Sequence, residues 1–99
     1  MKIITKEIEK KTPPIGTNAE SSLEDLRFIF KLFTPWSDWT WYVAEANFET
    51  GEMFGLVEGF EKEVGYFNLN ELMEIRGIGG LKIERDLHFQ PKTYEEIMN

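Results

Sequence analysis

Apolar residues recur at two different spacings along the 99-residue chain, and the change of spacing predicts where helix gives way to strand. Near the N-terminus, Ile4 and Ile8 lie on one face of a short helix for which Thr5 is a suitable N-cap. The Pro-Pro pair at 13–14 is expected to end this helix, because proline cannot donate a backbone hydrogen bond. The polar, turn-rich residues 15–22 are then expected to form a loop.

From residue 26 onward the apolar period becomes two, which is the spacing of a strand with one apolar face. The first such strand carries four alternating apolar side chains, Leu26, Phe28, Phe30 and Leu32. Three more strands are expected at residues 39–46, 53–60 and 64–67, separated by short turns. Because connections this short imply antiparallel neighbours, the segment predicts a four-stranded meander.

Helical spacing returns at Asn68, which has Glu71 three positions later in the pattern of a capping box. Gly77 is placed to end this helix. A last short helix is expected after Thr93, which has Glu96 at the equivalent position. Helices therefore flank the predicted sheet on its C-terminal side as well.

Residues 81–89 between these helices are expected to be extended, with Ile83, Leu87 and Phe89 on one face. The whole pattern predicts a single α+β domain, a four-stranded antiparallel meander with short helices packed on one face. Its expected parts are an N-terminal helix and Pro-Pro stop (1–14), an antiparallel sheet (26–67), a helix (68–77), and an extended segment with a short C-terminal helix (81–99).

Three tryptophans, Trp36, Trp39 and Trp41, form either a stacking surface or part of the core. Aromatic residues at strand period are more often buried, so Trp39 and Trp41 are expected in one core with Phe28, Phe30, Leu32, Phe54 and Leu56. Trp36 lies in a predicted turn and is a candidate binding residue. A further alternative is a ligand pocket between the sheet and the segment after Gly77, with Trp36 and Tyr94 at its rim.

The net charge of −7 is unevenly distributed, with +1 over residues 1–31 and −8 over residues 32–99. Such a surface repels phosphate groups, so direct binding of DNA or RNA is not expected. It favours a basic or nucleic-acid-binding protein as partner, and the candidate contact residues are Trp36, Asp38, Glu58, Glu61, Glu63 and Arg85. The alternative is that the charge only keeps the protein soluble.

Composition excludes several other classes of protein. The chain has no cysteine, so it has neither disulfides nor a thiolate metal site. No apolar run approaches the roughly 20 residues of a membrane-spanning helix, and the N-terminus is charged where a signal peptide is apolar. These features predict a soluble cytoplasmic protein. No catalytic residue and no cofactor is predicted, and the oligomeric state stays open.

The strongest chemical constellation is the segment IERDLHF, residues 83–89. If it is extended, Glu84, Asp86 and His88 share one face, and two carboxylates with an imidazole suit a divalent metal. Arg85 then lies on the opposite face. The segment therefore offers an alternative function as a small metal- or ligand-binding domain or enzyme. The other interpretation is that the two carboxylates face solvent or pair with Arg76, Lys82 or Arg85.

Four strings of the chain, taken together, have a familiar order and spacing: KIITKEI, KLFTPWSDWTWYVAE, FGLVEGFEKEVGYFNLNEL and IRGIGGLKIERDLHFQP. Over about residues 1–92 they resemble the family catalogued as domain of unknown function 2958, which consists of small bacterial proteins. The resemblance implies an association with plasmids and integrative elements, but no activity, cofactor or site. His88 departs from the aromatic residue expected there, which weakens the metal interpretation. The favoured hypothesis is a non-enzymatic protein-interaction module associated with mobile genetic elements.

Overall fold

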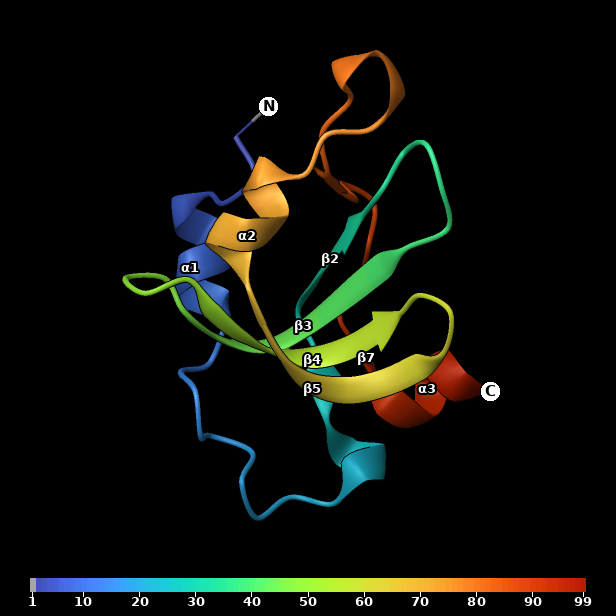
Figure 1. Cartoon of the computed structure of the whole chain (residues 1–99). Helices are drawn as coiled ribbons and strands as arrows, with labels where there is room; N and C mark the ends of the chain where they lie inside the picture. Colours follow the sequence, from blue (N-terminus) through green and yellow to red (C-terminus); the bar gives the residue numbers. More distant parts are fainter. Residues whose placement is uncertain (1) are drawn as a thin grey trace.

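The computed structural model describes residues 2–99 and has an antiparallel sheet at its centre (Figure 1). The strand order is β5-β4-β3-β2-β6, with bounds β2 (Phe30–Phe33), β3 (Thr40–Asn47), β4 (Glu52–Glu58), β5 (Lys62–Asn68) and β6 (Glu84–Arg85). A separate two-stranded sheet pairs β1 (Arg27–Phe28) with β7 (Lys92–Thr93). The helices are α1 (Lys6–Lys11), α2 (Leu69–Glu74) and α3 (Tyr94–Met98), with 3₁₀ turns η1 (Leu23–Asp25) and η2 (Ile78–Gly80).

The predicted α+β class and the antiparallel meander are confirmed, because β2, β3, β4 and β5 pair in sequence order. The sheet gains a fifth strand from the segment 81–89, which was predicted to be extended but was not placed in the sheet. This strand, β6, pairs with β2 through Leu32 opposite Arg85 and Phe33 opposite Glu84. It is only two residues long.

The strand expected from residue 26 is interrupted at Ile29, whose amide donates a 2.8 Å hydrogen bond to the carbonyl of Val43. This interruption changes which side of the sheet the alternate side chains face. Leu26 and Phe28 lie on one side of the sheet, whereas Phe30 and Leu32 lie on the other. The expectation of one continuous apolar face was therefore wrong, and both faces of the sheet carry a core.

The first face, defined here as the side on which Trp41 and Val43 lie, is covered by α1 and α2 through Ile8 and Leu72. Ile83, from the segment before β6, joins this core. The predicted start of α1 is confirmed, since the Thr5 hydroxyl accepts a 3.2 Å hydrogen bond from the Ile8 amide.

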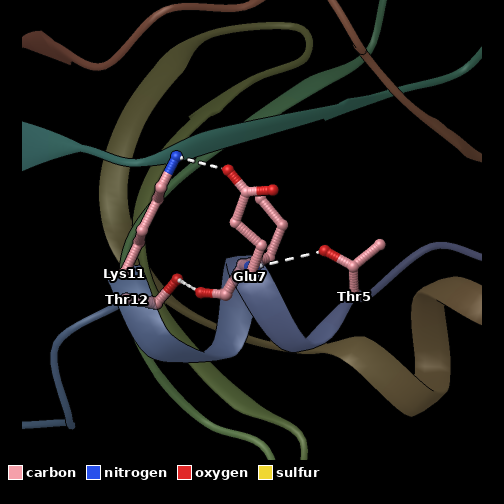
Figure 2. Close-up of polar contacts among 5 residues, drawn as sticks. Thr5, Glu7, Lys11 and Thr12 are labelled. Carbon is pink, nitrogen blue, oxygen red and sulfur yellow. Dashed lines mark hydrogen bonds and ion pairs between the residues drawn. The ribbon is translucent and has the colours of Figure 1, made fainter.

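Figure 2 shows how α1 is closed at both ends. The Lys11 ammonium donates to the Glu7 carboxylate at 2.8 Å, and this hydrogen bond holds the pKa of Glu7 below its ordinary value. After the last turn, the Thr12 hydroxyl donates to the Ile8 carbonyl at 2.7 Å. Helix α1 therefore presents Ile8 to the sheet from a short but well-capped turn.

The second face, on which Tyr42 and Ala44 lie, is covered by α3 and by Phe89. Thr93 and Glu96 form the predicted capping box at the start of α3. Because of this second cover, the helices do not all pack on one face. Phe28, Phe54 and Leu56, which were expected in the tryptophan core, belong to this second cluster instead.

A β-bulge in β3 decides which residues reach each face. Val43 lies opposite Gly55 and Glu45 lies opposite Phe54, so Ala44 is an extra residue without a partner in β4. Glu45 consequently shares the second face with Phe54, while Ala46 returns to the first-face core. Gly55 has no room for a side chain, because a Cβ there would overlap the carbonyl of Tyr42.

The region after α2 differs from the prediction. The helix expected over residues 68–77 ends at Glu74. Arg76 and Lys82 form an isolated β-bridge, and the Gly77 amide donates to the Leu81 carbonyl at 2.7 Å. These bonds close a hairpin-like loop in which Gly79 and Gly80 have positive φ.

The segment 81–89 is not one extended strand. Its Asp86 carboxylate accepts a 2.9 Å hydrogen bond from the His88 amide, which makes a local turn. Ile83 is consequently buried on the first face and Phe89 packs against the second, while Leu87 is exposed.

Candidate functional site

The β2–β3 and β4–β5 connections lie at the same end of the sheet (Figure 1). Five apolar side chains gather there. We call them the aromatic end: Trp36, Trp39, Trp41, Phe60 and Ile75. The tryptophans, Ile75, Thr34 and Ser37 line an apolar hollow of about 440 Å³. Ile75 reaches this end because α2 runs back along the first face and stops there.

The aromatic rings change from buried to exposed across this end. Trp41 is 5% exposed and belongs to the first-face core, so its predicted burial is confirmed. Trp39 stacks on it with ring centres 6.0 Å apart, but is only half-buried, as is Trp36. Phe60 is 94% exposed and meets Trp39 edge-to-face at 5.5 Å.

Two glycines determine where the outer indoles lie. A Cβ on Gly77 would overlap the ring of Trp36, and a Cβ on Gly59 would overlap the ring of Trp39. Both rings therefore lie flat against backbone, which a larger residue at either position would prevent. Gly77 does not end α2, which already ends at Glu74. Its lack of a side chain instead leaves room for the indole of Trp36.

Hydrogen bonds from Thr34 fix the turn that carries Trp36. The Thr34 hydroxyl accepts from the Trp39 amide at 3.2 Å and lies 2.5 Å from the Ser37 hydroxyl. The Thr34 amide donates to the Trp39 carbonyl at 3.0 Å. Thr34 is itself buried, so this turn is held from inside and the indoles are preorganised.

Acidic residues border the aromatic end. Glu61 and Glu63 line an adjoining depression of about 330 Å³ together with Trp39 and Phe60. Glu58 pairs with Lys62 at 4.0 Å. Five of the predicted contact residues thus lie in or next to the two connections at this end: Trp36 and Asp38 between β2 and β3, Glu61 between β4 and β5, and Glu58 and Glu63 at the adjoining ends of those strands.

Arg85 is the predicted contact residue that the fold places elsewhere. It lies on β6, at the opposite edge of the sheet from β5, which carries Glu63. Its Nε donates a 2.7 Å hydrogen bond to the Ile3 carbonyl, so its role is to tie the N-terminal segment to β6.

The residues of the metal hypothesis do not come together as ligands. Among residues 2–99, no group of three or more His, Asp or Glu side chains is arranged to hold a metal ion. Asp86 lies 3.7 Å from the Lys31 ammonium and accepts from the His88 amide. Lys31 lines the same hollow of about 350 Å³ as Glu84 and His88, so a positively charged side chain is already next to the proposed ligands. For Asp86 this geometry corresponds to the ion-pair alternative, although the partner is Lys31 and not Arg76, Lys82 or Arg85.

The pocket expected between Trp36 and Tyr94 does not form. Trp36 packs against the first-face core and Tyr94 against the second, so the sheet separates them. The prediction failed because the face change at Ile29 and the second cover by α3 were not visible in the periodicity.

Two informative residues were missed in the sequence. Phe60 stands in the short turn GFEKE, where an exposed aromatic residue at a hairpin tip has no role in a core. Glu45 is the only charge in the apolar run TWYVAEA, and it is 2% exposed. An isolated charge in a buried strand was the available signal.

The described fold and surface define a small α+β domain with an exposed aromatic, acid-bordered end. Within residues 2–99, no helix is both long and apolar enough to cross a lipid bilayer. The chain belongs to the family described as protein of unknown function (DUF2958), whose match spans residues 3–95. Comparisons with curated proteins and with solved structures found no match.

Proposed function

We propose that this protein is a non-enzymatic interaction module whose aromatic end binds a basic, amphipathic segment of a partner protein. The exposure of Phe60 is the observation that carries the proposal. A phenylalanine that is 94% exposed on a defined turn contributes little to the protein's own core. Exposed aromatic side chains beside half-buried ones are typical of protein-binding surfaces.

The apolar part of the surface is suited to anchoring a side chain of the partner. Trp36 and Trp39 are held by Gly77, Gly59 and the hydrogen-bonded turn at Thr34, so they lose little conformational freedom when a partner binds. The adjacent hollow of about 440 Å³ has almost entirely apolar walls. It is therefore suited to an aliphatic or aromatic anchor from the partner.

The charge around the anchor favours a basic partner over a neutral one. Glu61 and Glu63 border the depression next to Phe60, and the chain as a whole has a net charge of −7. Such a field speeds encounter with a cationic segment and opposes nucleic-acid phosphates. We place the partner among the basic, nucleic-acid-binding proteins of mobile genetic elements, in line with the family resemblance of the sequence.

The three tryptophans make the proposal measurable, because all of them line the same hollow. Intrinsic fluorescence should shift when an amphipathic peptide of alternating lysine and leucine is titrated in. A peptide with glutamate in place of lysine should leave the emission unchanged at the same concentration. Binding should weaken as salt rises, since the rim charges are solvent-exposed.

Phe60→Ala should reduce affinity for the basic peptide by about tenfold or more, as expected for an aromatic anchor. Leu87→Ala is the matched control, because Leu87 is also an exposed large apolar residue but belongs to the segment after β6. Equal affinity of the basic and acidic peptides, or equal losses in the two variants, would contradict the proposal.

A further inference from the structure

A second hollow lies on the other face of the sheet and has different chemistry. It has a volume of about 380 Å³ and is enclosed by the loop after the Pro-Pro pair, η1 and the neighbouring strands. Its apolar walls are Leu23, Leu26, Phe54 and Tyr66, and Glu45 and Asn18 supply polar groups. A largely apolar hollow with a few convergent polar groups is the usual form of a small-molecule site.

The Glu45 carboxylate is the unusual feature of this hollow, because it is 2% exposed and has no counter-ion. Among residues 2–99, no lysine, arginine or histidine nitrogen lies within ion-pair distance of it. Its charge is stabilised only by N–H donors of the loop. Oε1 accepts from the Gly16 amide at 2.8 Å, and Oε2 accepts from the Asn18 amide and side chain at 2.7 and 2.8 Å.

These three hydrogen bonds leave part of the accepting capacity of the Glu45 carboxylate unused. A carboxylate offers about four lone-pair directions, and the loop uses three of them. The remaining one is on Oε1. A single N–H donor can satisfy it, whereas the paired donors of a guanidinium would need a free direction on each oxygen.

Aromatic rings complete the environment that a cation requires. Phe54 and Tyr66 lie with their ring centres 4.9 Å apart and both face the hollow that contains Glu45. The π face of an aromatic ring attracts a cation, and it does so more strongly where water is excluded. Tyr66 is exposed whereas Glu45 is buried, so the ring is accessible from solvent beside the carboxylate's hollow.

We infer that this hollow binds the ammonium group of a small organic amine with an apolar body. The ammonium donates one hydrogen bond to Oε1 of Glu45 and supplies the missing counter-charge. The apolar body of the amine lies against Leu23, Leu26 and the two rings. This site is on the opposite face from the aromatic end and does not depend on the proposed partner.

The test is a titration of the full chain with 2-phenylethylammonium, followed by ¹H–¹⁵N NMR. The amide signals of Gly16 and Asn18 should shift most, because both amides bond to the carboxylate that receives the ligand. The neutral isostere 2-phenylethanol and the corresponding guanidinium should each bind at least tenfold more weakly. Equal affinity for the alcohol, or no shift with millimolar ammonium, would overturn the inference.

Variants separate the charge from the walls of the hollow. Glu45→Gln should abolish the preference of the ammonium over the alcohol. Because that variant also disturbs the loop, Tyr66→Ala gives a second test, and it should weaken ammonium binding severalfold in a protein whose core is intact. Phe60→Ala is the control and should bind the ammonium with unchanged affinity. A Tyr66→Ala variant with full ammonium affinity would count against the site.

Discussion

The two faces of the central sheet differ in what they expose and what they bury. At the aromatic end of the first face, apolar rings stay in contact with water: Phe60 is exposed, and Trp36 and Trp39 are only half-buried. On the second face, a carboxylate is removed from water and is satisfied by three N–H donors. The same strand, β3, supplies Trp41 to one and Glu45 to the other. In a regular strand Glu45 would share a face with Trp41 and Val43, so the extra residue Ala44 is what directs the carboxylate to the second face.

The largest effect should come from breaking the bulge that separates the faces. In Gly55→Ala, the new methyl group would overlap the Tyr42 carbonyl, so the free energy of unfolding should fall by about 3 kcal/mol. Gly65→Ala is the matched control, because Gly65 is the partner of Gly55 in β5 and has open space around it. Urea denaturation measures both. Equal losses in the two variants would show that the close approach at Tyr42 is not what matters.

The next effect should come from removing the buried carboxylate. Glu45→Ala leaves the Gly16 and Asn18 amides without their acceptor, and this should cost about 2 kcal/mol of stability. Hydrogen exchange of these two amides should accelerate more than exchange within β4. Glu49→Ala, at an exposed glutamate of the following turn, should change stability by less than about 0.5 kcal/mol. Slow exchange at Gly16 in Glu45→Ala would contradict the assigned role.

A smaller effect should come from loosening α3, which covers only the second face. Thr93→Ala removes the hydroxyl that accepts from the Glu96 amide at 3.2 Å, and loss of an N-cap should cost about 1 kcal/mol. Fluorescence of the three tryptophans should stay unchanged in the native state, because α3 packs against the other cluster. A shifted emission spectrum would show that the two faces are coupled.

The smallest effect concerns the pH dependence of the same cap. Hydrogen bonds from the Thr93 amide, and then from its hydroxyl, hold the pKa of Glu96 below its ordinary value of 4.5. The folded pKa is depressed, so this contribution to stability is present above pH 4.5 and is lost as pH falls through the folded pKa. NMR titration should show the Glu96 pKa rising toward 4.5 in Thr93→Ala. An unchanged pKa would exclude the hydroxyl as a cause.

Local features of the fold were predictable because neighbours in sequence determine them. The Thr5 cap, the Glu7–Lys11 pair and the Thr93–Glu96 box depend on spacings of three or four residues. The meander was predictable for a similar reason, since short connections permit only antiparallel neighbours.

Features that depend on partners distant in sequence were not predictable from periodicity. The face change at Ile29 depends on the pairing of β1 with β7 and of β2 with β3. The packing of Trp36 on Gly77 also joins residues that are far apart in sequence. Likewise, the acidic part of the site was found from charge density, but Phe60 and Glu45 were not. Phe60 is an exposed apolar residue and Glu45 is a buried charged one. A pattern analysis that expects apolar residues inside and polar residues outside therefore misses both.

The unpaired position at Ala44 also constrains how this chain can change in length during evolution. Deleting that residue would restore regular alternation along β3 and would leave Glu45 opposite Phe54 on the second face, with Ala46 still on the first. A related chain that lacks this position should therefore keep a carboxylate where this one has Glu45. It should also retain the loop after the Pro-Pro pair, whose N–H groups bind that carboxylate.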